Sequence, residues 1–91
     1  MEPQTVKIPL NVAIDAARDL NEYVVSLDRI FSRLGTGEYD ERILSDYVVD
    51  RRVLQRIAAL RAHVFDALEE VVGAEKAEEI AEESYTYTDP T

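Results

Sequence analysis

Residues 10–34 read LNVAIDAARDLNEYVVSLDRIFSRL, and within them an apolar stripe returns every three or four residues. This spacing is typical of one face of an α-helix in a coiled coil or helical bundle. Ala16, Tyr23 and Ile30 widen the stripe beyond what one partner helix covers, so we predict an all-α fold with a multi-helix core. The stripe consists of Leu10, Ala13, Ala17, Leu20, Val24, Leu27, Phe31 and Leu34.

Proline and glycine residues predict where this first helix begins and ends. Pro3 and Pro9 disfavour helix in the residues before them, so residues 1–8 are expected to form an extended arm. The helix is expected to run over 9–34 and to end at Gly35, because glycine is a frequent C-terminal cap. The Gly-Thr-Gly sequence that follows predicts a turn.

The second half of the chain predicts a long helix over 40–72, a short helix over 74–84 and a flexible tail over 85–91. The apolar stripe of the long helix changes register near residues 49–50, which we interpret as either a kink or a break. Two long helices with a short connection form an antiparallel hairpin. A hairpin alone leaves wide apolar stripes in water. We therefore expect the single domain, 1–91, to pair with a second copy as a four-helix-bundle homodimer.

The net charge of -9 is concentrated at one end of the chain. Residues 1–65 hold ten acidic and nine basic residues, whereas residues 66–91 hold nine acidic residues and one basic residue. Such a field repels phosphate groups, so we expect no direct binding to nucleic acid or to a membrane, and a basic protein as partner. There is no cysteine, signal-peptide pattern or apolar run of bilayer length, and we expect a soluble, cytoplasmic protein.

The expected homodimer uses apolar positions on both long helices and charges that orient them. In the second long helix, Arg52 and Arg56 lie in the N-terminal half and Glu69 and Glu70 in the C-terminal half, opposite to what the helix dipole favours. An antiparallel copy would bring these halves together. The predicted interface residues are Leu20, Val24, Leu27, Phe31, Arg52, Arg56, Leu60, Arg61, Val64 and Leu68.

Arg61 lies among apolar residues of the long helix and has two interpretations. In one, its guanidinium contacts an anionic ligand inside the bundle, because its fork of donors matches a carboxylate, and the chain is a small enzyme or ligand-binding protein. In the other, which we favour, Arg61 extends from the edge of the stripe into water or pairs with Glu22 or Asp28.

No catalytic, cofactor-binding or metal site is predicted. His63, Asp66 and Glu70 have the spacing of helical metal sites, but they offer one histidine on a face that is expected to be wet. The acidic run over residues 66–83 has two interpretations: a surface that mimics phosphate groups toward a nucleic-acid-binding protein, or simple solvation of an outward face. We therefore expect a non-enzymatic interaction module, acting as an adaptor, accessory or neutralising partner of another protein.

Two families offer partial resemblances. The length and helix order are similar to those of the all-helical chorismate mutases, which share several core-directed basic residues where this chain offers Arg61. Residues 85–89, Tyr-Thr-Tyr-Thr-Asp, resemble the YxxxD tail of the small helical-hairpin substrates of type VII secretion. The Trp-x-Gly turn of that family is replaced here by Gly35-Thr36-Gly37. The first resemblance implies an enzyme and the second a secreted hairpin, and both are kept as alternatives.

Overall fold

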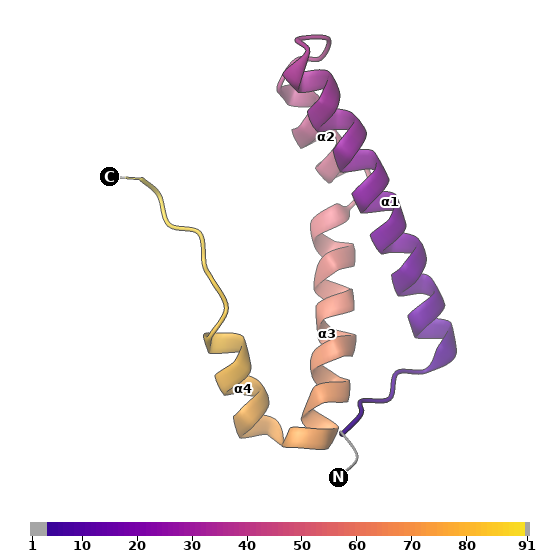
Figure 1. Cartoon of the computed structure of the whole chain (residues 1–91), viewed down its shortest axis with the longest axis vertical. Helices are drawn as coiled ribbons and strands as arrows, with labels where there is room; N and C mark the ends of the chain where they lie inside the picture. The colour runs from indigo at the N-terminus through magenta and orange to yellow at the C-terminus, as the bar shows by residue number, and fades with distance from the viewer. Residues whose placement is uncertain (1–3, 91) are drawn as a thin grey trace.

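The computed structural model describes residues 4–90, and within them the chain has four helices and no strand. They are α1 (Leu10–Gly35), α2 (Arg42–Asp50), α3 (Val53–Val72) and α4 (Ala74–Glu82) (Figure 1). α1 forms one arm of an antiparallel hairpin, while α2 and α3 follow one another along the other arm and both contact α1. α4 folds back against α3 alone. The all-α prediction is confirmed.

The ends of α1 are set by Pro9 and by a glycine turn. The amide of Ala13 donates to the carbonyl oxygen of Pro9 at 3.0 Å, which starts the helical hydrogen-bond pattern. Gly35, the expected cap, is the last helical residue of α1. The left-handed conformation is adopted by Gly37 instead, with a φ of 78°. Glycine accepts this conformation without steric cost, so the turn lies slightly later than expected.

The second arm is broken between α2 and α3, just after the position where the sequence suggests a kink or a break. α2 ends at Asp50, and Arg52 then adopts a left-handed backbone with φ 52° and ψ 41°. This conformation costs a residue with a side chain about 1–2 kcal/mol, so other contacts have to stabilise the break. The amide of Arg56 donates to the carbonyl oxygen of Arg52 at 3.0 Å and so begins α3.

A second glycine turn joins α3 to α4. Gly73 has a φ of 88° and lets the chain fold back on itself. Ala77 of α4 is buried and Ile80 is half-buried, and α4 has no contact with any described helix other than α3. Residues 4–9 and 85–90 contain no helix, and residues 1–3 and 91 of the expected arm and tail lie outside the described residues.

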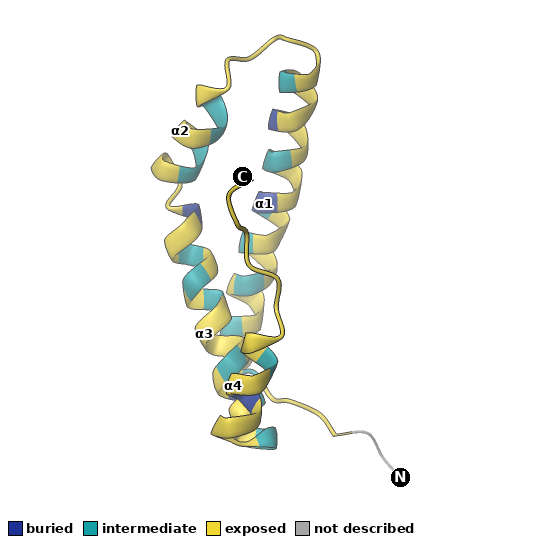
Figure 2. Ribbon diagram, turned by 90° about the vertical axis from the view of Figure 1, so that its left-hand side faces the viewer, coloured by how far each residue is buried: buried dark blue, intermediate teal, exposed yellow. Residues whose placement is uncertain are grey.

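The hairpin is open and its core is thin. Among the described residues, only Tyr23, Ile30, Val53, Ala67 and Ala77 are buried, and Figure 2 shows them scattered singly along the helices. The radius of gyration is 16.9 Å, whereas a compact domain of this length has about 12 Å. The chain exposes 7799 Å², which is roughly 2,400 Å² more than a folded monomer of its mass exposes. The segments without helix, residues 4–9 and 85–90, supply part of this excess area, and the hairpin supplies the rest.

Candidate interaction surface

One face of the hairpin carries large apolar side chains that no part of the described chain covers, and we call it the open face. Its members come from α1 and α3 and are between 44 and 69 % exposed. Each set recurs at helical spacing, so its members lie on one side of their helix. The open face consists of Leu20, Val24 and Phe31 from α1 and Leu54, Ile57 and Val64 from α3. Exposed apolar area gathered on one face in this way makes the open face a candidate interaction surface.

A groove between α1 and α3 lies at the centre of the open face. It is lined by Ala16, Leu20 and Tyr23 from α1 and by Ile57, Leu60, Arg61, Val64 and Phe65 from α3. Arg61 is the only charged residue of this lining, and only apolar surface faces the groove. A ligand site normally adds several convergent polar groups to an apolar pocket. The groove is therefore suited to apolar side chains.

The ten predicted interface residues fall into three groups. Leu20, Val24, Phe31 and Val64 belong to the open face, and Leu60 and Arg61 line its groove. Leu27 and Leu68 are half-buried, so part of each side chain already packs within the chain. Arg52 is exposed at the α2–α3 break, and Arg56 points inward. The most buried residues of α1 are Tyr23 and Ile30, which flank the stripe, whereas Leu27 and Leu34 of the stripe itself are half-buried.

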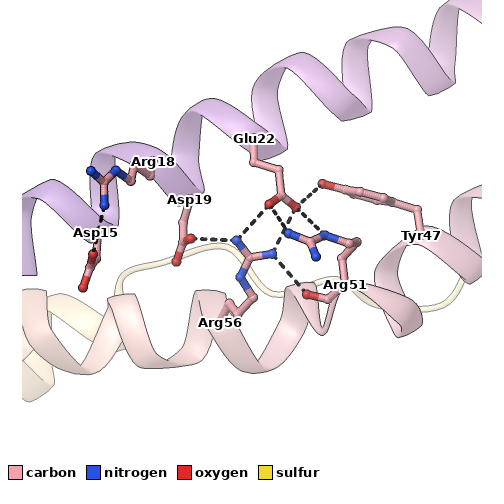
Figure 3. Close-up of polar contacts among 7 residues, drawn as sticks. All are labelled: Asp15, Arg18, Asp19, Glu22, Tyr47, Arg51 and Arg56. Atoms are coloured by element: carbon pink, nitrogen blue, oxygen red, sulfur yellow. Dashed lines mark hydrogen bonds and ion pairs between the residues drawn. The ribbon is translucent and has the colours of Figure 1, made fainter.

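The α2–α3 break is held by one carboxylate from α1, in a cluster that we call the clasp (Figure 3). Glu22 accepts hydrogen bonds from the Tyr47 hydroxyl at 2.9 Å, from Arg51 Nη2 at 2.7 Å and from Arg56 Nη1 and Nη2 at 3.0 Å. Asp19 accepts a further bond from Arg56 Nη2 at 2.6 Å. Glu22 thus ties the end of α2 and the first turn of α3 to the same point of α1.

Arg56 also acts directly on the break. Its Nη1 donates to the carbonyl oxygen of Arg51 at 3.1 Å, a group that the interrupted helix leaves free. Its guanidinium carbon lies 5.0 Å from the ring centre of Tyr23, within the range of a cation–π contact. The clasp therefore offsets the cost of the left-handed residue that separates α2 from α3.

The clasp fixes the charges of its members. Hydrogen bonds from Arg51 and then Arg56 hold the pKa of Glu22 far below its usual range, although burial works in the opposite direction. The same hydrogen bonds to Glu22 raise the pKa of both arginines. With a further bond from Arg51 Nε at 3.3 Å, Glu22 accepts five hydrogen bonds. A carboxylate that stays ionised in this way has no proton to exchange near neutral pH. The clasp is built for structure and not for acid–base catalysis.

Sequence reasoning considered Glu22 only as a partner for Arg61, and the clasp was missed. Glu22 binds Arg51 and Arg56 instead. Arg51 lies in the break between α2 and α3 and Arg56 in the first turns of α3, 29 and 34 residues after Glu22. The charge of Arg56 is therefore used within the chain. Of the two arginines expected to meet the acidic end of a second copy, only Arg52 makes no ion pair among the described residues.

The other polar candidates are dispersed. His63 is exposed and lines a second cleft with Asp15 and Asp19 of α1, whereas Asp66 and Glu70 lie on a separate surface of α3. Within residues 4–90, no group of three or more His, Cys, Asp or Glu side chains is placed to hold a metal ion. None of the described helices combines the length and hydrophobicity of a membrane-spanning segment.

Comparisons with protein-family models, with curated proteins and with solved structures found no match for this chain.

Proposed function

We propose that the chain is a small helical protein–protein interaction module whose working form is a homodimer. The observation that carries this proposal is the open face, because six large apolar side chains on two neighbouring helices remain largely in water. Each would contribute to stability once covered, at about 25 cal/mol for every Å² of apolar area removed from water.

A second copy is the occupant that best matches this surface. The open face is formed by two helices and a shallow groove, and the same face on a second hairpin would complete a four-helix bundle. An ordinary interface removes about 800 Å² from each partner. That area lies well within the roughly 2,400 Å² by which the exposed area of the chain exceeds that of a compact monomer.

The acidic end gives the dimer a second surface. Asp66, Glu69 and Glu70 are exposed at the end of α3, and α4 adds further acids against one lysine. This end lies away from the centre of the open face, so it is free to contact a basic protein. With one surface for dimerisation and another for a basic protein, the module would act as an adaptor, accessory or neutralising partner. A ligand site around Arg61 has less support, because no polar surface faces the groove that Arg61 lines.

The proposal is tested by a matched pair of variants, Val24→Asp and Val25→Asp. The two valines are neighbours in α1 and are 68 and 50 % exposed, but only Val24 lies on the open face. Light scattering after gel filtration should give a dimer for the native chain and for Val25→Asp, and a monomer for Val24→Asp. Circular dichroism should show equal helix content in all three. Equal masses for the two variants would overturn the proposal.

A further inference from the structure

Resting on the proposed homodimer, we infer the register in which the two copies meet. The two α1 helices pair antiparallel across a two-fold axis at Val24. Phe31 of each copy then packs over the partner's Ala17, and Arg61 forms an ion pair with the partner's Asp28. Shape and charge support this register independently.

The shape argument starts from the outer stripe of α1. Ala17 and Phe31 both lie seven residues from Val24, on opposite sides of it, and all three are exposed. In an antiparallel pair with a two-fold axis at Val24, residues at equal distances before and after Val24 stand opposite each other. A large ring then meets a methyl group at both ends of the contact, which is the alternation that lets helix surfaces interdigitate.

The length of α1 favours the same axis. The helix runs from Leu10 to Gly35, so Val24 is the exposed stripe residue closest to its midpoint among Leu20, Val24 and Phe31. An axis at Phe31 would place most of α1 beyond the end of its partner and lose the apolar contact. An axis at Leu20 would set Phe31 opposite Pro9, outside the helix. Only the register at Val24 keeps nearly the whole stripe covered.

The charge argument uses two residues that have no hydrogen-bond or ion-pair partner among the described residues, Asp28 and Arg61. Asp28 lies four residues after Val24, so the antiparallel register sets it opposite Leu20 of the other copy. Arg61 lines the same groove as Leu20. Each arginine therefore meets the partner's Asp28, and the pair forms twice. A parallel pairing would bring like charges together, which disfavours that orientation.

Disulfide cross-linking tests the register, because the chain has no cysteine and a single introduced thiol is unique. A residue on a two-fold axis lies close to its own copy, within the roughly 7 Å between Cα atoms that a disulfide allows. Under mild oxidation, Val24→Cys should form a covalent dimer at least about tenfold faster than the neighbouring control Val25→Cys. Rates that are equal, or faster for the control, would overturn the register.

Charge reversal provides a second, independent test of the register. Arg61→Asp and Asp28→Arg should each raise the dimer Kd by about tenfold, because each replaces two attractions with two repulsions. The double variant should return Kd close to the native value. Failure of this rescue, with the native chain still a dimer by mass, would refute the register and leave the proposed function standing. A native chain that stays monomeric would refute both.

Discussion

Phe31→Ala should weaken the dimer and leave the fold of the single chain intact. Phe31 is 56 % exposed in the single chain. A phenylalanine side chain presents about 200 Å², so roughly 110 Å² is left for the partner to cover. At about 25 cal/mol per Å², this area is worth roughly 2.5–3 kcal/mol per chain. Both copies lose it, so the dimer loses roughly 5–6 kcal/mol and its Kd should rise by about four powers of ten.

The fold of the hairpin should survive this change. Alanine favours helix more than phenylalanine, so the helix content of the isolated chain should not fall. Sedimentation equilibrium over a dilution series measures Kd, and circular dichroism at each concentration reports helicity. Val25→Ala is the control, because that half-exposed valine lies off the open face and its removal should leave Kd nearly unchanged. A Phe31→Ala protein that associates as tightly as the native chain would refute the reasoning.

Three further changes test the clasp and the break between α2 and α3. The clasp lowers the pKa of Glu22, so its stabilisation is complete above the ordinary glutamate pKa of about 4.3 and is lost as pH falls below it. Glu22→Gln should lower the Tm at pH 7, and the difference from the native Tm should shrink in acid; a constant difference would contradict this. Arg52→Gly should raise the free energy of unfolding by about 0.5–1 kcal/mol in chemical denaturation by relieving the left-handed backbone, whereas Gln55→Gly inside α3 should lower it by a similar amount. The buried Tyr23 hydroxyl has no hydrogen-bond partner among the described residues, so Tyr23→Phe should raise the free energy of unfolding by about 1 kcal/mol; a loss of stability would show that the hydroxyl is satisfied.

Periodicity alone predicted the all-α class, because the helical repeat of apolar residues in α1 is long and regular. It could not show which part of a wide stripe meets which neighbour. Tyr23 and Ile30, read as the flank of the stripe, are buried against the second arm, whereas Leu20, Val24 and Phe31 at its centre are exposed. The repeat fixes the angle of a residue around its own helix, but the choice of neighbour depends on how the helices pack.

The clasp could not be predicted for a related reason. Glu22, Arg51 and Arg56 are ordinary charged residues with no motif between them, and only the register of α1 against the second arm brings them together. The left-handed backbone at Arg52 had no sequence signal either, since glycine or asparagine would be expected there.

The central claim is that the open face is covered by a second copy, and the molar mass of the native chain tests it most directly. Sedimentation equilibrium at micromolar concentration and neutral pH should give twice the chain mass of 10.3 kDa. On dilution, the mass should fall toward that of the monomer, and the Tm should fall with it. A mass of 10.3 kDa over the whole series, with helicity and Tm independent of concentration, would contradict the account.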